Sequence, residues 1–184
     1  MSDSLSLQFD GLEEAMSEKK YIIGHRSVAH TFSLKRFIDY GYRSRHSSFY
    51  DVFLSLFSLH NETTNIWSHL IGCICCFIAG INCITDLWFH SKDSLEISAF
   101  LSFIICACFC LLSSCVYHWF GCLSESCHKS LLALDQFGVG LLVASSFLPG
   151  VYYGFYCSPT AQVFHFVLTG IVLISKIQLI TSST

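Results

Sequence analysis

Four long apolar segments follow one another along this chain, separated by short polar connections. They lie at about residues 66–88, 97–120, 132–156 and 162–180. Each is about as long as the 20 or so apolar residues that a helix needs to cross a hydrocarbon layer roughly 30 Å thick. No Asp, Glu, Lys or Arg occurs from Gln136 to Ser175. The pattern therefore predicts an all-α membrane protein with four transmembrane helices in residues 66–180.

The part of the chain before the first span is polar and basic. Residues 1–46 hold every Lys and Arg except Lys92, Lys129 and Lys176. The opening, residues 1–18, is acidic and rich in Ser, has no apolar core of the signal-peptide type, and is expected to be disordered. Residues 47–65 form an interfacial segment and entry motif, in which the stretch from Phe49 to His60 places apolar side chains on one helical face. This suits a short helix at the membrane interface or, alternatively, a buried helical turn.

Composition and charge narrow the class of protein further. Hydrophobic residues make up 53% of the chain and charged residues 12%, with a mean hydropathy of +0.56, which excludes an ordinary soluble domain. The net charge of −3 argues against a nucleic-acid partner. The basic N-terminal region predicts a cytosolic N-terminus by the positive-inside rule, and four spans return the C-terminal tail, 181–184, to the cytosol. The sequon that begins at Asn61 is then expected to be unglycosylated.

Several polar side chains stand at the predicted inner ends of the spans. Glu62, Asn65 and His69 follow the spacing i, i+3, i+7 and would share one face of a helix. Polar side chains that lie close to the hydrocarbon need hydrogen-bond partners, so this stretch predicts a buried polar site.

The predicted topology brings more polar groups to the same depth. His69, His118 and Asp135 fall at the inner ends of three spans, and Ser114 lies four residues before His118 on the same face. Two imidazoles and a carboxylate suit Zn²⁺, which activates water when one ligand position stays open. The alternative is that these residues only bond between helices or contact interfacial water.

Five stretches of this sequence carry a resemblance to a known family: GYR at 41–43, SLFSLHNETTNIWSHLIG at 55–72, SSCVYHWF at 113–120, LALDQFG at 132–138 and SFLPGVYYGFYCSP at 146–159. They resemble the progestin and adipoQ receptor family, which is related to haemolysin III, and most of all its adiponectin-receptor branch. The resemblance implies a receptor fold of seven membrane helices, of which this chain holds the first four. It also implies a zinc site in which His118 is a ligand and Asp135 holds the zinc-bound water. Glu62, Asn65 and His69 would support that site.

The chain departs from the family pattern after the fourth span. The family's last helix supplies a His-x-x-x-His pair to the zinc, whereas His165 is the only histidine after Asp135 here. The expected zinc site is therefore incomplete, and the chain is expected to be a truncated form.

The resemblance implies a multi-pass receptor for a hormone or lipid ligand, in the plasma membrane or an internal membrane such as the Golgi. Some relatives look like ceramide amide hydrolases. By that analogy Ser114 of this chain would stabilise the oxyanion, although the incomplete set of zinc ligands disfavours an enzyme here. The alternative is a non-catalytic scaffold or regulator that binds membrane lipid, forms homo-oligomers, or assembles with full-length relatives or cytosolic proteins.

Small residues predict where the helices touch. Gly72, Cys76 and Gly80 recur every four positions, and Gly150 with Gly154 forms a second pair. Most of the eleven cysteines lie in or beside apolar spans, where packing is their expected role.

Overall fold

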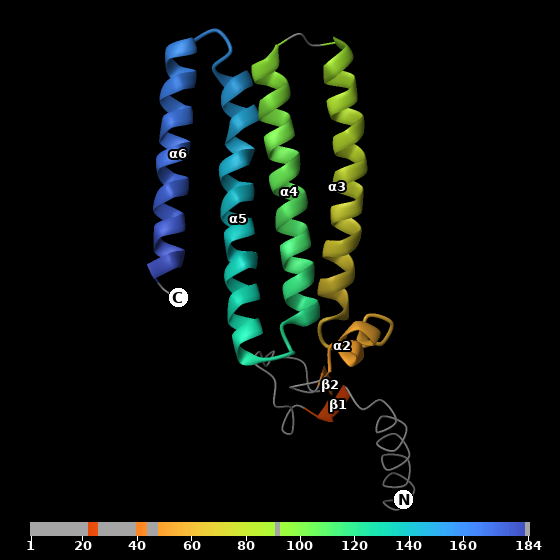
Figure 1. The fold of residues 1–184 in the computed structure, drawn as a ribbon. Helices are drawn as coiled ribbons and strands as arrows, with labels where there is room; N and C mark the ends of the chain where they lie inside the picture. The colour runs from red at the N-terminus through yellow and green to blue at the C-terminus, as the bar shows by residue number, and fades with distance from the viewer. Residues whose placement is uncertain (1–21, 26–39, 44–47, 91–92, 183–184) are drawn as a thin grey trace, which may run out of the picture. The chain divides into compact units, whose positions relative to one another are not determined.

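The computed structural model describes residues 22–25, 40–43, 48–90 and 93–182, which form two short strands and five helices (Figure 1). These residues divide into two compact units. The first unit comprises the described residues up to Trp67 together with Val116–Leu131, and the second comprises the described residues of Ser68–Cys115 and those from Leu132 onward. The expected disorder of residues 1–18 lies outside the described residues.

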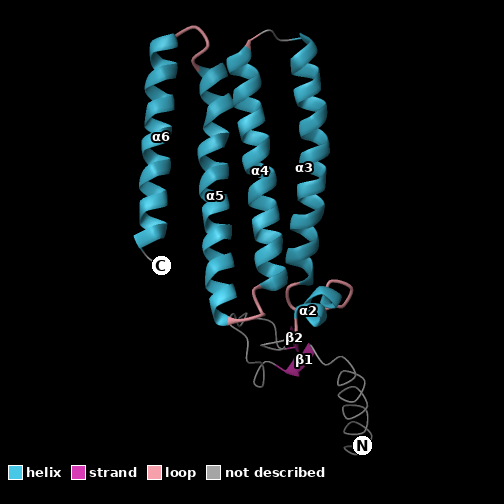
Figure 2. Cartoon of the chain, in the orientation of Figure 1, coloured by secondary structure: helices cyan, strands magenta, loops and turns pink. Residues whose placement is uncertain are grey.

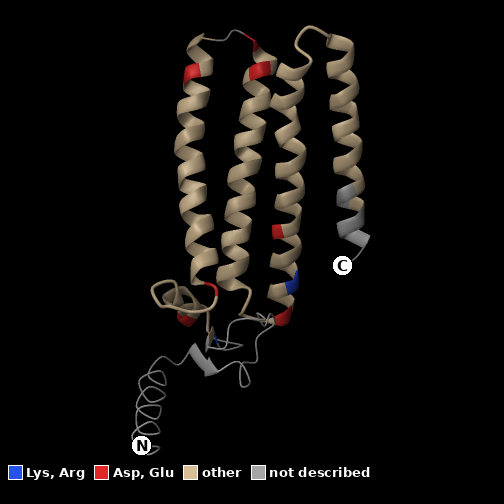
Figure 3. Ribbon diagram, turned by 180° about the vertical axis from the view of Figure 1, so that it is seen from behind, with Lys and Arg blue, Asp and Glu red and all other residues tan. Residues whose placement is uncertain are grey.

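The four predicted spans are all helical. They correspond to α3 (Thr63–His90), α4 (Ser94–Phe120), α5 (Glu125–Gly154) and α6 (Pro159–Ser182). By length and composition α3, α4 and α5 could each cross a membrane, and α6 contains the shorter apolar helix Pro159–Ser175. Long stretches of these helices carry no charged residue (Figure 3). The prediction of an all-α membrane protein is confirmed.

Two short strands form an antiparallel pair ahead of the helices (Figure 2). They are β1 (Ile22–His25) and β2 (Tyr40–Arg43), and their register pairs Ile22 with Arg43. The sequence pattern did not predict these strands, because four residues are too few for an alternating pattern to stand out. They show that part of the polar N-terminal region has regular structure.

Helix α2 (Phe49–Ser55) is shorter than the apolar pattern from Phe49 to His60 suggested. It begins with a capping box, in which the Ser48 hydroxyl accepts from the Asp51 N–H and the Asp51 carboxylate accepts from the Ser48 N–H. After the helix the chain continues in turns, and α3 begins eight residues later. The expected helical face is therefore confined to two turns.

The glycines of the second unit differ in what surrounds them. A Cβ added at Gly80 would lie 2.5 Å from Cγ2 of Ile104, and one at Gly138 would lie 2.6 Å from Oγ of Ser113. Close packing at Gly80 was predicted. A Cβ at Gly150 or Gly154, by contrast, would meet nothing within 4 Å among the described residues, so this pair makes no close helix contact there.

Candidate functional site

The first unit holds a polar cluster where α3 begins. Glu62 lies one residue before α3, and its carbonyl accepts from the N–H of Ile66 at 3.0 Å. The N–H of Glu62 donates to Nδ1 of His60 at 3.1 Å. Glu62 is thus a helix-capping residue, whereas the spacing argument had treated it as part of the helix together with Asn65 and His69.

The carboxylate of Glu62 joins this cluster to the last turn of α4. Its Oε2 lies 2.9 Å from Nδ1 of His118 and also accepts from the Asn65 side chain, while Oε1 accepts from Nδ2 of Asn61 at 3.1 Å. Because an ionised carboxylate only accepts hydrogen bonds, Nδ1 of His118 carries the hydrogen. The side chains of Glu62 and His118 are 11% and 16% exposed, so the pair is largely removed from water.

His60 contributes a neutral imidazole beside this pair. The pKa of His60 is lowered to about 4, mainly by burial and also by the positive charge of Arg43, while the charge of Glu62 acts in the opposite direction. A neutral ring is also what the hydrogen bond from the Glu62 N–H requires, because Nδ1 can accept it only when unprotonated.

Two tryptophans position α2 against this cluster. Nε1 of Trp119 donates to the carbonyl of Val52 at 2.9 Å, and Nε1 of Trp67 donates to the carbonyl of Leu56 at 3.2 Å. The Trp119 ring also stacks on Phe53 with a centroid distance of 5.4 Å. Sequence reasoning assigned neither tryptophan a role, although both lie inside the family-like stretches that also contain Glu62 and His118.

The remaining predicted site residues lie in the second unit. Ser114 is buried, whereas His69 and Asp135 are half-buried. The structure thus brings together Glu62, Asn65 and His118 within one unit, and the convergence of His69 and Asp135 with His118 remains a prediction.

The fit of the described residues to a zinc ion can be tested on the donors themselves. In the first unit Glu62 already accepts from several donors, and one imidazole, that of His118, faces it. Across the described part of the chain, no group of three or more His, Cys, Asp or Glu side chains could hold a metal ion. A zinc site needs about four ligands, usually three or more from the protein, so these residues do not by themselves fit zinc.

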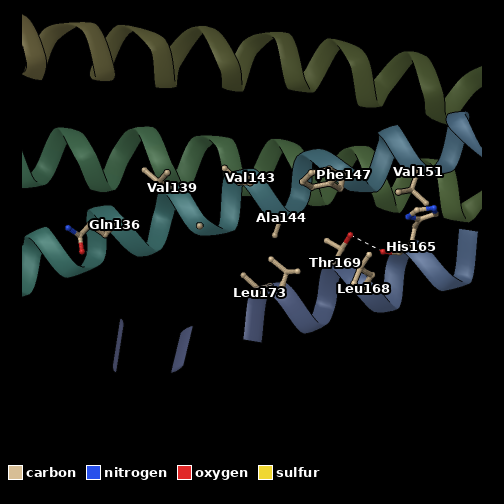
Figure 4. Close-up of a pocket in the computed structure, with 12 residues that line it drawn as sticks. Gln136, Val139, Val143, Ala144, Phe147, Val151, His165, Leu168, Thr169 and Leu173 are labelled. Carbon is tan, nitrogen blue, oxygen red and sulfur yellow. Dashed lines mark hydrogen bonds between the residues drawn. The ribbon is translucent and has the colours of Figure 1, made fainter. Parts of the chain in front are cut away.

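A cavity of about 710 Å³ lies in the second unit between α5 and α6 (Figure 4). Its walls are mostly apolar, and Gln136, His165 and Thr169 contribute its polar groups. Thr169 Oγ1 donates to the carbonyl of His165 at 2.9 Å, and the His165 ring stacks on Phe155 at a centroid distance of 4.4 Å. The volume lies within the range of small-molecule pockets, and the lining is mostly apolar.

Comparison with known proteins places the chain in a family. Residues 57–184 match the profile of the family described as "Haemolysin-III related". "Progestin and adipoQ receptor-like protein 1" of Caenorhabditis elegans is 35% identical over 146 residues, and "Adiponectin receptor protein" of Drosophila melanogaster is 38% identical over 146 residues. Each alignment covers 77% of this chain and 32% of the relative.

A third relative is "Progestin and adipoQ receptor family member 3" of Homo sapiens, which is 40% identical over 111 residues. That alignment covers 56% of this chain and 34% of the relative. The chain thus spans about a third of the length of these relatives. Since the family profile matches well over half of its residues, this integral membrane protein belongs to the haemolysin-III-related family, and it is similar in sequence to progestin and adipoQ receptors.

Proposed function

We propose that this chain acts as a receptor-type membrane protein and that the Glu62–His118 pair is its functional centre. The observation that carries the proposal is the burial of this pair where α3 begins and α4 ends. Burying a carboxylate costs solvation free energy that simple packing does not require, so a buried carboxylate at the end of a membrane helix is a candidate functional position. The names of the relatives support the receptor class.

The ligand that we propose is apolar and membrane-borne, such as a lipid or a lipid-like hormone. The cavity between α5 and α6 supports this choice, since most of its lining residues are apolar and its few polar groups could orient one polar end of a ligand.

Zinc at His118 is a separate part of the proposal. In metal sites a ligating histidine commonly bonds its second ring nitrogen to a carboxylate, which fixes the orientation of the ring, and Glu62 occupies that position here. The described residues fall short of a ligand set, so no hydrolytic role for Asp135 or Ser114 follows from them. Lipid amide hydrolysis therefore stays a prediction from the resemblance.

Metal analysis of the purified full chain tests this part. Zinc held through His118 should be lost in His118→Ala and kept in His128→Ala, a control that removes another imidazole of the first unit, one that contacts Tyr117. Zinc bound equally by all three proteins would refute the role of His118. A wild type without zinc would leave Glu62 and His118 as a purely polar centre and would favour the scaffold described next.

The second candidate function is a non-catalytic scaffold or regulator. The incomplete ligand set in the described residues favours it, as do the large apolar side chains that α6 leaves exposed, among them Phe164, Val167 and Ile171. Such a face suits another membrane helix, from a second copy or a full-length relative. Crosslinking in native membranes tests this function, and a single monomeric band would count against it.

We also propose that the N-terminus is cytosolic and that α2 lies at the membrane interface. Phe49, Tyr50 and Phe57 are more than half exposed, as expected for aromatic side chains in contact with lipid headgroups. The exposed Cys157 lies in the connection between α5 and α6, which this orientation places on the opposite side of the membrane from the N-terminus. In sealed microsomes, an impermeant maleimide should label Cys157 only after detergent is added, measured against Cys157→Ser. Labelling before detergent would reverse the orientation.

A further inference from the structure

Arg43 joins strand β2 to the end of helix α4. Its Nη2 donates to the carbonyl of His118 at 2.5 Å, and its Nη1 donates to the carbonyl of Trp119 at 2.7 Å. Nη1 also lies 3.3 Å from Oγ of Ser55 in α2. Arg43 is 4% exposed, so the guanidinium is held inside the first unit and does not extend into solvent.

These contacts complete the hydrogen bonding at the C-terminal end of α4. The last four carbonyls of a helix have no partner within the helix. Here the carbonyl of Tyr117 accepts from Gly121 N–H at 2.8 Å and that of Phe120 accepts from Leu123 N–H at 3.0 Å. The carbonyls of His118 and Trp119 are the two that Arg43 binds, and that of Trp119 also accepts a longer contact from Sγ of Cys122 at 3.8 Å. The planar guanidinium offers two N–H groups in a fixed fork, which suits this pair of acceptors.

The charge of Arg43 is also suited to this position. A cation is stabilised at the negative end of a helix dipole, and the carboxylate of Glu62 adds electrostatic attraction. Burial nevertheless lowers the pKa of Arg43, and its Nε has no hydrogen-bond partner among the described residues. Holding the group here therefore has a cost, which the two carbonyl contacts must offset.

The residues before Arg43 explain how its side chain is positioned at the C-terminal end of α4. Gly41 has φ of +81°, a conformation that side chains disfavour, and its carbonyl accepts from the N–H of Asn61 at 2.9 Å. Tyr42 is fully buried. The stretch Gly41–Arg43 thus contacts the chain beside Glu62 through Gly41 and the main chain of His118 through Arg43.

We propose that Arg43 is a positioning residue for His118. Arg43 fixes the main chain of His118, Glu62 fixes the imidazole, and both contacts together set the direction of the ring. This inference rests on the proposed function in that it takes His118 as the functional centre. It adds that the N-terminal strand, through the stretch GYR, controls the geometry of that centre.

The test observes the His118 ring itself. The full chain, with ¹⁵N-labelled histidine, is placed in lipid nanodiscs, and the Nδ1 resonance of His118 is identified by its loss in His118→Gln. Arg43→Gln removes the charge and the fork, whereas Arg43→Lys keeps the charge without the fork. Lys129→Gln is the matched control, because it removes a cation of the first unit whose ion pair with Glu125 is exposed.

We expect the Nδ1 resonance of His118 to move in both Arg43 variants and to stay in place in Lys129→Gln, with helical content retained in all three. An unchanged resonance in the Arg43 variants would overturn the proposal. Loss of helicity in both would also overturn it, since Arg43 would then be needed for folding and not for placing one side chain. Zinc analysis of His118→Ala tests the functional centre separately, because the Nδ1 resonance of His118 reports the geometry of the ring whether or not the metal binds.

Discussion

The same substitution, Glu to Gln, should have very different effects at two carboxylates of the first unit, each of which has a nitrogen partner. Glu62 pairs with His118 at 2.9 Å with both side chains largely buried, and Glu125 pairs with Lys129 at 3.0 Å with side chains 63% and 74% exposed. The change removes a charge and preserves shape in both cases. The comparison therefore isolates the contribution of burial.

The expected cost at Glu62 follows from its hydrogen bonds. The carboxylate accepts from His118, Asn65 and Asn61 through two oxygens. Glutamine has one acceptor oxygen and one NH₂ group, so whichever way the amide is turned, a donor faces another donor. Losing a charge-assisted bond and leaving one buried donor without an acceptor costs about 2–4 kcal/mol, whereas Glu125→Gln should cost less than about 1 kcal/mol.

Reversible unfolding in mixed micelles of mild detergent and SDS, followed by tryptophan fluorescence, measures both free energies. Trp67 and Trp119 lie in the first unit and report on it. Equal free energies of unfolding for the two variants would refute the reasoning, since burial of the Glu62–His118 pair would then contribute nothing to stability.

Three further predictions concern stability. Because the folded protein keeps the pKa of His60 near 4 and the ordinary value is 6.5, only the unfolded chain gains a proton between these pH values. The free energy of unfolding should therefore fall by up to about 1.4 kcal/mol per pH unit as pH drops through this window, and His60→Asn should flatten the pH profile. Gly138→Ala should cost about 1–3 kcal/mol by forcing a methyl group against Ser113, while Gly150→Ala on the same helix should change stability by less than about 1 kcal/mol; equal SDS midpoints would contradict the packing argument. Trp119→Phe should cost about 1 kcal/mol by removing the bond to Val52 and should speed proteolysis after α2, and an unchanged cleavage rate would contradict this.

The sequence predicted the membrane helices because their signal is local. A span such as α4 is apolar along nearly its whole length, and twenty consecutive apolar residues have few other stable arrangements. The same holds for Glu62, Asn65 and His118 as candidate site residues, since polar groups at the ends of such spans stand out from their surroundings.

The partners of those polar groups could not be predicted in the same way. The spacing argument placed Glu62 on one helical face with Asn65 and His69, whereas its carboxylate binds His118, 56 residues further along the chain. Arg43 was counted as part of a basic region that predicts orientation and of the family-like stretch GYR, without a partner, yet its side chain binds carbonyls 75 and 76 residues away. Contacts over such separations depend on how the helices pack, which hydropathy does not encode.

The sequence alone determined that this chain is a helical membrane protein of the haemolysin-III-related family, and it identified the polar residues that hydrocarbon would not tolerate without partners. Only the tertiary structure decided which partners they have: Glu62 with His118, and Arg43 with the carbonyls of His118 and Trp119 at the end of α4. The physical reason is that hydrophobic length is a property of one segment, whereas the hydrogen bonds that satisfy a buried polar group depend on which segments fold against it.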